Sequence, residues 1–309
     1  MPKKGKRAPK EPEERKEEGR SKAKVYHENA YTKLDTKINL HKINNEIETC
    51  EEKELRKEKR KKDKADRATV EQVLDERTRR ILLKLINNEV VHEINGCLST
   101  GKEANVYHAV NHTSGREFAI KIYKTSILVF KDRDRYVEGE FRFRRGYCSS
   151  NPRKMVAMWA EKELRNLKRM EGVILCPEGI QVKANVLLME FVGKDMKNAP
   201  RLKDADIQGV EQWSLIYLEV ARIMRVLYQQ CKLVHADLSE YNMLYYEGKV
   251  WVIDVSQSVE HDHPHSLDFL RRDIANINNF FKMKGVSVFS DWNLFQFIVA
   301  TGIKPGQEL

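Results

Sequence analysis

The sequence predicts an α+β fold in which a small, sheet-rich lobe is followed by a mostly helical lobe. Short apolar stretches of the kind that form buried strands occur in the first part of the chain, and apolar residues recur at helical spacing through much of the remainder. The length of 309 residues suits one two-lobed domain or two ordinary domains. Periodicity alone therefore indicates an architecture and leaves the function open.

Positive charge is concentrated near the N-terminus. The formal net charge is +10, and residues 1–67 hold 22 Lys and Arg against 15 Asp and Glu. A segment of this composition cannot bury enough apolar surface to fold, so we expect a charged, disordered tail, although its basic excess also suits nucleic-acid phosphates. The cluster at residues 56–62 fits a nuclear address as well, a pattern that often matches by chance.

An N-terminal helical extension is predicted at residues 68–95, and the sheet-rich lobe at residues 96–189. Thr69 opens a stretch with capping-box spacing, so a helix is expected to begin there and to run to Asn88. A long insertion at about 126–154, rich in Arg, Gly and Ser, is interpreted as mobile. The other elements expected here are a turn-rich loop at 94–107, strands at 105–110, 118–123 and 186–189, and a helix at 155–170.

The helical lobe is predicted at residues 190–309. A long amphipathic helix at 210–230 precedes a strand, turn and strand at 245–253, and helices are expected around 266–283 and 291–300. No run of about eighteen apolar residues occurs, so no membrane span is expected. The five cysteines are scattered and form no C-x-x-C pair, which is typical of free thiols in a reducing compartment rather than of a zinc site.

The strongest chemical signal is the motif H-x-D-x-x-x-x-N, which begins at His235 after the long helix and before the strand pair, as the catalytic loop of phosphotransferases does. In this motif Asp237 would accept or orient the proton of the attacking oxygen, and the amide of Asn242 would reach a magnesium ion. Asp254 ends the next apolar strand, where a carboxylate suits the principal magnesium ligand. Either aspartate alone would more simply hydrogen-bond a loop, but the combination with Asn242 favours the catalytic interpretation.

Two further segments suit a bound triphosphate. In S-T-G-K-E-A, which begins at Ser99, hydroxyl groups and a glycine can approach phosphate, although the stretch matches neither the ordinary kinase nor the Walker pattern. F-A-I-K resembles V-A-I-K and puts Lys121 on a strand that faces the phosphates, where a lone lysine would otherwise protect a strand edge. Such a lysine needs a carboxylate, and Glu163 is preferred over Glu161 because it shares a helix face with Leu167 that points toward the sheet.

The segment at residues 189–193 is expected to link the lobes and to bind adenine. Adenine needs one backbone acceptor and one donor between apolar walls, and an extended linker can offer both. By position the carbonyl of Glu190 and the amide of Val192 would supply them, beside Met189. The simpler alternative is a strand end that leads into a loop.

Together these motifs resemble one family, the RIO atypical kinases. The motifs that carry the resemblance are S-T-G-K-E-A at residues 99–104, L-V-H-A-D-L-S-E-Y-N at 233–242 and I-D-V-S-Q at 253–257. The type-one branch is indicated by two further stretches, I-N-G-C-L-S-T-G-K-E-A-N-V-Y-H-A and R-F-R-R-G-Y-C. The resemblance covers about residues 70–309 and does not include the first 67 residues. It implies a two-lobed, protein-kinase-like fold with a trimmed C-terminal lobe.

The resemblance also implies an atypical serine/threonine protein kinase that binds ATP and Mg²⁺ between its lobes. It assigns phosphate contact to Ser99 and to Lys121 paired with Glu163, adenine to Glu190 and Val192, catalysis to Asp237, and the metal to Asn242 and Asp254. In this family the metal-binding aspartate can itself take the phosphoryl group as an aspartyl-phosphate. Because family members serve late maturation of the small (40S) ribosomal subunit, we expect a cytoplasmic, monomeric protein whose partner is a pre-40S particle, with its protein and rRNA.

Departures from ordinary kinases favour ATP hydrolysis over transfer to a protein hydroxyl. Ala236 replaces the arginine of H-R-D, D-V-S replaces D-F-G at Asp254, and no A-P-E follows. The platform that holds an extended peptide is therefore expected to be absent, and transfer to a hydroxyl then loses the positioning that drives it. Autophosphorylation is still expected, with Ser149 and Ser150 in the insertion as candidates.

Two other functions fit part of the same pattern. A small-molecule kinase of the aminoglycoside or choline type shares H-x-D-x-x-x-x-N, but it needs a substrate lobe for which the C-terminal part offers little room. A non-catalytic RNA-binding assembly factor would keep a nucleotide site only to stabilise its fold. Screening against aminoglycosides and choline tests the first, and an Asp237→Ala protein that still completes maturation would support the second.

Overall fold

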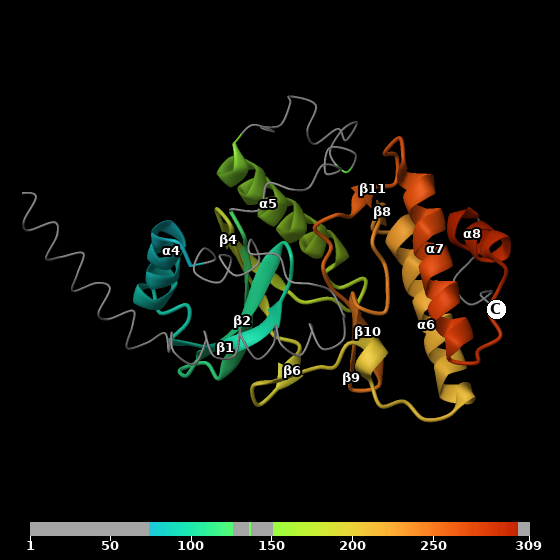
Figure 1. Cartoon of the computed structure of the whole chain (residues 1–309), viewed down its shortest axis with the longest axis horizontal. Coiled ribbons are helices and arrows are strands. Elements are labelled where there is room, and N and C mark those ends of the chain that lie inside the picture. Colours follow the sequence, from blue (N-terminus) through green and yellow to red (C-terminus); the bar gives the residue numbers. More distant parts are fainter. Residues whose placement is uncertain (1–73, 126–135, 137–150, 302–309) are drawn as a thin grey trace, which may run out of the picture.

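The computed structural model describes residues 74–125, 136 and 151–301. The expectations for the charged tail, for most of the insertion and for Ser149 and Ser150 lie outside these residues. The described part has the two predicted lobes, with the sheet on the N-terminal side and the long helices on the C-terminal side (Figure 1). The α+β, two-lobed, kinase-like architecture is thus confirmed.

The N-terminal lobe is a five-stranded antiparallel sheet in the order β1-β2-β3-β5-β4. Alternate residues of β3 face opposite sides, so Ile120 and Ile122 pack with helix α4 in one apolar cluster, while Lys121 and Tyr123 face helix α5. The elements of this lobe are α4 (Glu76–Asn87), β1 (Glu93–Thr100), β2 (Ala104–Asn111), β3 (Arg116–Tyr123), α5 (Pro152–Met170), β4 (Gly179–Lys183) and β5 (Val186–Glu190).

The C-terminal lobe is built on three helices, with α8 packed against α6 and α7. Apolar residues on the facing sides of these helices, among them Tyr217, Phe281 and Leu294, form the larger core. The segment between β8 and β9 carries the H-x-D motif. The elements are β6 (Gly193–Lys194), β7 (Lys197–Asn198), η3 (Leu202–Asp204), α6 (Val210–Gln229), β8 (Leu233–Val234), β9 (Met243–Tyr246), β10 (Lys249–Val252), β11 (Val259–Glu260), α7 (Ser266–Met283) and α8 (Asp291–Val299).

Two predicted elements at the start of the described chain are wrong in part. Helix α4 begins at Glu76, while the predicted start at Thr69 lies outside the described residues. The backbone of Asp75 is extended, and its carboxylate accepts from the amide of Thr78 and caps the helix. The stretch predicted as a turn-rich loop is largely strand β1. Its pairing with β2 shifts register twice, so its buried residues do not alternate and the strand pattern is not visible in the sequence.

Helix α5 begins three residues before the predicted start. Asn151 caps it by accepting from the amide of Lys154, and Pro152 occupies the first turn, where its missing amide costs nothing. Residues 152–154 therefore belong to this helix and not to the insertion. Within the insertion Tyr136 is described, and its ring stacks on Phe269 at 4.9 Å between centroids.

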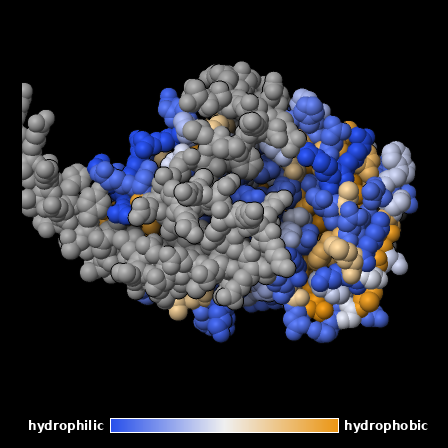
Figure 2. Space-filling model, viewed as in Figure 1, coloured by the Kyte–Doolittle hydropathy of each residue, from blue (hydrophilic) through white to orange (hydrophobic). Residues whose placement is uncertain are grey.

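The outer face of the C-terminal lobe is mixed in character. Figure 2 shows apolar side chains interleaved with hydrophilic ones over this part of the molecule. Leu215, Met283 and Trp292 are among the exposed large apolar residues. Among the helices of the described ranges, none has the length and apolar character needed to cross a bilayer.

Candidate active site

A cavity of about 850 Å³ lies between the two lobes. Its walls come from β1, β2, β3 and β5 on one side and from the segments after β8 and β10 on the other. All the sequence-predicted site residues line it, namely Ser99, Lys121, Glu163, Met189, Glu190, Val192, Asp237, Asn242 and Asp254. Folding thus brings together residues that are up to 155 positions apart in the sequence, from Ser99 to Asp254.

Lys121 connects the two lobes across this cavity. Its Nζ lies 2.9 Å from Oε1 of Glu163 on α5 and 2.8 Å from Oδ1 of Asp254. The side chains of Lys121 and Glu163 are 8% and 1% exposed. Burial alone would lower the pKa of Lys121, but the charges of Asp254 and Glu163 hold it above its ordinary value. Of the two glutamates that the sequence offered, Glu163 is the one paired with Lys121, while Glu161 is exposed and pairs with Arg165 at 3.5 Å.

Asp254 follows β10 in a left-handed backbone conformation, with φ at 58°. This uncommon conformation aims the carboxylate back toward Lys121, and Ser256 donates to the same Oδ1 at 3.0 Å. Burial would raise the pKa of Asp254, but Lys121 and the hydroxyl of Ser256 hold it below its ordinary value. The carboxylate is therefore ionised. Its Oδ2 accepts a hydrogen bond from neither Lys121 nor Ser256, because both donate to Oδ1.

Asp237 and Asn242 face Asp254 from the segment after β8. The Nδ2 of Asn242 donates to the carbonyl of Asp237 at 2.8 Å and to its Oδ2 at 3.1 Å, which turns the amide oxygen of Asn242 away from that carboxylate. Partial burial and the charge of Asp254 raise the pKa of Asp237 to about 6. Two carboxylates and an amide oxygen around one cavity are the hard oxygen donors that Mg²⁺ or Ca²⁺ prefers.

A divalent cation would need further ligands here. In the part of the chain that the structure describes, no group of three or more His, Cys, Asp and Glu side chains gathers as a metal site. Magnesium usually takes one or two carboxylates and completes its shell with water and phosphate oxygens. Asp254 and Asn242 therefore suit a cation that arrives together with a phosphate ligand.

The remaining predicted residues form the opposite wall. Ser99 lies at the end of β1 rather than in a loop, and its hydroxyl accepts from Nη2 of Arg201 at 3.1 Å. Gly101 closes the tight turn to β2 by donating its amide to the carbonyl of Ala104 at 2.9 Å. A side chain there would meet that carbonyl at 3.1 Å, so a small residue suits the turn.

The linker between the lobes is fixed by backbone pairing. The amide of Glu190 donates to the carbonyl of Glu178 at 2.9 Å, and the side chain of Glu190 accepts from the amide of Glu178 at 3.0 Å. The carbonyl of Val192 accepts from Ala199 at 2.9 Å. An extended, well-held segment beside Met189 is the environment predicted for an adenine ring.

Comparison with known proteins agrees with this geometry. The family model described as the RIO domain matches residues 105–293. This chain belongs to the RIO domain family. Over 278 residues it is 57% identical to serine/threonine-protein kinase RIO1 of Homo sapiens, an alignment that covers 88% of this chain and 49% of that protein.

Other relatives carry the same printed name. The chain is 60% identical over 271 residues to serine/threonine-protein kinase rio1 of Schizosaccharomyces pombe, covering 87% of this chain and 53% of that protein. It is 50% identical over 284 residues to serine/threonine-protein kinase RIO1 of Saccharomyces cerevisiae, covering 84% and 58%. The predicted type-one branch is thus confirmed, and the chain spans about half the length of the curated relatives it matches.

The sequence analysis missed a buried residue that supports the loop that carries the H-x-D motif. Asp273 on α7 is 1% exposed, and its two carboxylate oxygens accept from the amides of Ala236 at 2.8 Å and Leu238 at 2.9 Å. These amides flank Asp237, and Ala236 is held at a φ of 70°. The sequence signal that could have found Asp273 is its position on the apolar face of α7, four residues after Phe269, where a charged residue is unusual.

We expect Asp273→Asn to destabilise the protein by about 1–3 kcal/mol, because one buried backbone amide of the loop then meets a donor instead of an acceptor. The free energy of unfolding in urea measures the change. Asp268→Asn is the matched control on the same helix, since Asp268 is 64% exposed and its change should lie within about 0.5 kcal/mol. Equal unfolding free energies for the two variants would show that Asp273 does not support the loop.

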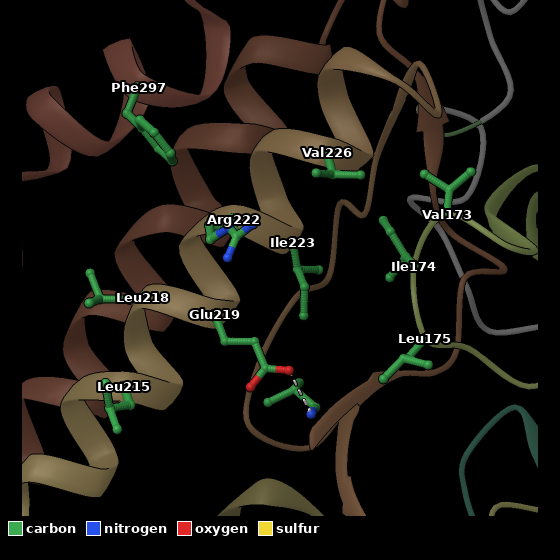
Figure 3. A pocket seen from close by; sticks show the side chains of 11 residues that line it. Val173, Ile174, Leu175, Leu215, Leu218, Glu219, Arg222, Ile223, Val226 and Phe297 are labelled. Carbon is green, nitrogen blue, oxygen red and sulfur yellow. Dashed lines mark hydrogen bonds between the residues drawn. The ribbon is translucent and has the colours of Figure 1, made fainter. Parts of the chain in front are cut away.

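A second cavity lies in the C-terminal part of the RIO domain and has a different character. It has a volume of about 490 Å³ and is lined by apolar side chains from residues 173–175, from α6 and from α8 (Figure 3). The carboxylate of Glu219, which also lines this cavity, accepts from the amide of Val250 at 3.1 Å (Figure 3). None of the site residues named above lines this cavity, so it does not supply phosphotransfer chemistry.

Proposed function

We propose that this chain is an atypical serine/threonine protein kinase with ATPase activity that requires ATP and Mg²⁺ and acts in late maturation of the small ribosomal subunit. One observation carries the catalytic part: Lys121 is held between Glu163 and Asp254 at the meeting point of the lobes, opposite Asp237 and Asn242. Membership of the RIO domain family and the printed names of the relatives support the same activity.

Each residue has a distinct role in this proposal. Lys121 binds the phosphates and Glu163 fixes its direction, while Met189, Glu190 and Val192 hold the adenine. Asp237 orients the attacking water and accepts its proton, and Asn242 and Asp254 hold the metal. Mg²⁺, when bound, neutralises the charge of the phosphates.

ATP hydrolysis is the favoured reaction. Residues 255–265 connect Asp254 to α7, which leaves no room among them for an extended peptide platform. In the proposed route Oδ2 of Asp254 attacks the γ-phosphorus, the bond to the bridging oxygen breaks and ADP leaves. Water, which gives a proton to Asp237, then cleaves the aspartyl-phosphate to inorganic phosphate and the free carboxylate. Support comes from the orientation of this carboxylate by Lys121 and Ser256, which both use Oδ1.

The ribosomal setting rests on the family resemblance. We place the protein in the cytoplasm with a pre-40S particle as partner, bound through protein and rRNA. The excess of Lys and Arg in the N-terminal segment favours binding to the RNA phosphates of such a partner.

The decisive experiment measures ATP turnover with and without purified pre-40S particles. We expect the particles to change turnover, and we expect an acid-stable, base-labile phosphoprotein in the wild type that is missing from Asp254→Asn. MgATP at one hundred times its dissociation constant should stabilise the folded protein by about 2.7 kcal/mol. A wild-type protein that neither binds nor hydrolyses MgATP would rule out this function.

A further inference from the structure

A chain of buried polar groups runs from the N-terminal helix to the catalytic lysine. It begins at Thr78 on α4, passes through Asn185 and Tyr123 and ends at Glu163 and Lys121. All five residues are at most 6% exposed. Buried polar groups are stable only when paired, so each member of this chain depends on its neighbours.

The decisive contact is between Tyr123 and Glu163. Tyr123 is the last residue of β3 and stands two positions after Lys121, so both side chains leave the same face of the sheet. The hydroxyl of Tyr123 donates to Oε2 of Glu163, while Lys121 donates to Oε1 at 2.9 Å. The Glu163 carboxylate is thus held at both oxygens, which fixes its rotation and the direction in which it holds the lysine.

The backbone of Tyr123 is itself held by hydrogen bonds to Asn185. Its backbone amide donates to the carbonyl of Asn185 at 2.9 Å, and Nδ2 of Asn185 donates to the carbonyl of Tyr123 at 3.0 Å. The same Nδ2 also donates to the hydroxyl of Thr78 at 3.0 Å. The end of β3 is therefore held against α4, on the side of the sheet opposite the active site.

We propose that Tyr123 is a positioning residue for phosphotransfer, which holds Glu163 in the conformation that binds Lys121, and that Asn185 anchors it to α4. This inference rests on the proposed function, because the lysine must bind phosphate for its direction to matter. The side chain of Tyr123 acts through Glu163 and touches neither nucleotide nor metal. The ring also packs in the core, so the hydroxyl and the ring must be tested separately.

The test is Tyr123→Phe, which removes the hydroxyl and keeps the ring. Without this donor the buried Oε2 of Glu163 loses its partner and the carboxylate can turn away from Lys121. We expect MgATP to bind about tenfold more weakly and kcat to fall as well, at a temperature where the variant is fully folded. Fluorescence titration with a labelled ATP analogue and steady-state turnover measure the two effects.

Tyr107→Phe is the matched control. Tyr107 lies on the neighbouring strand β2, is 1% exposed, and its hydroxyl accepts from Asn105 at 3.4 Å, outside the active-site chain. This variant loses a buried hydroxyl from the same sheet, so it reports the cost of that loss to folding. We expect its nucleotide affinity to equal that of the wild type.

A double variant separates positioning from general stability. If Tyr123 acts through Glu163, then Tyr123→Phe should weaken MgATP binding in the wild type but add less than twofold in a Glu163→Gln background. If the hydroxyl has only a structural role, its removal should weaken binding equally in both backgrounds. The double variant also removes the buried charge, so it provides a folded protein should the single variant fail to fold.

The outcomes are distinguishable from failure of the proposed function. A wild type that binds no MgATP contradicts the kinase proposal itself. A wild type that binds MgATP, together with a folded Tyr123→Phe of unchanged affinity and turnover, overturns only the role of Tyr123. Equal effects of Tyr123→Phe in both backgrounds overturn it too.

Discussion

Lys121→Met is expected to abolish nucleotide-dependent turnover and to lower the free energy of unfolding by about 3–5 kcal/mol. The catalytic loss follows from the removal of the only cation that Glu163 and Asp254 share in the described site. The loss of stability follows because Glu163, 1% exposed, is left as a buried charge without its ionic partner. Urea unfolding and ATP turnover measure the two losses.

The double variant Lys121→Met with Glu163→Gln separates the two effects. It removes the buried charge along with its partner, so we expect most of the lost stability to return while turnover stays absent. Lys183→Met, an exposed lysine on β4, is the control for the substitution itself and should change neither property. A single variant as stable as the wild type would show that the pair contributes nothing to folding.

The stability defect of Lys121→Met should depend on pH in a defined direction. Burial raises the pKa of Glu163 and Lys121 opposes that rise, so removal of the lysine raises this pKa further. A carboxyl whose pKa is higher in the folded state binds its proton more tightly there, and folding is favoured at low pH. The defect should therefore be full at pH values above the raised pKa of Glu163 and shrink as the pH falls through that pKa.

Asp237→Asn should lower kcat by about 10²–10⁴-fold and leave MgATP affinity within a few-fold of the wild type. Asparagine keeps the shape and the hydrogen bond to Asn242, but it cannot accept the proton of the attacking oxygen. Single-turnover kinetics with saturating ATP measure the chemical step directly. The effect is expected on hydrolysis and on any phosphoryl transfer alike, since an attacking water and an attacking hydroxyl must both be oriented and lose a proton.

Asp262→Asn is the control for Asp237→Asn. Asp262 lies exposed in the segment between β11 and α7 and lines neither cavity, so its change should leave kcat unaltered. Full turnover by Asp237→Asn, with mass spectrometry showing that the asparagine is intact, would remove Asp237 from the catalytic role.

The site was predictable from sequence because its chemistry requires particular residue types at fixed local spacing. Asp237 and Asn242 lie on one loop, and that loop fixes their separation. Lys121 and Asp254 lie on or after apolar strands that are visible as short runs in the sequence. The choice of Glu163 over Glu161 also followed from a local property, the face of α5 on which each stands.

The errors and omissions share a different cause. Strand β1 was missed because its register shifts depend on its partner β2 and not on its own pattern. The start of α4 was misplaced because the capping role of Asp75 was not recognised, and that role shows only in the contact between its carboxylate and the amide of Thr78. Tyr123 and Asp273 were missed because a tyrosine or an aspartate in an element gains its role from what packs against it.

By itself the sequence determined the two-lobed α+β order, the family and the set of residues that line the cavity, because periodicity and motif spacing are local properties of the chain. Only the tertiary structure decided which oxygen of Asp254 faces Lys121, which groups hold Glu163 and what supports the catalytic loop. Those details depend on contacts between residues 35 to 133 positions apart in the sequence, whose geometry is set when the sheet, α5 and the C-terminal lobe pack together. The physical reason is that a buried polar group must find its partner in the folded core, wherever that partner lies along the chain.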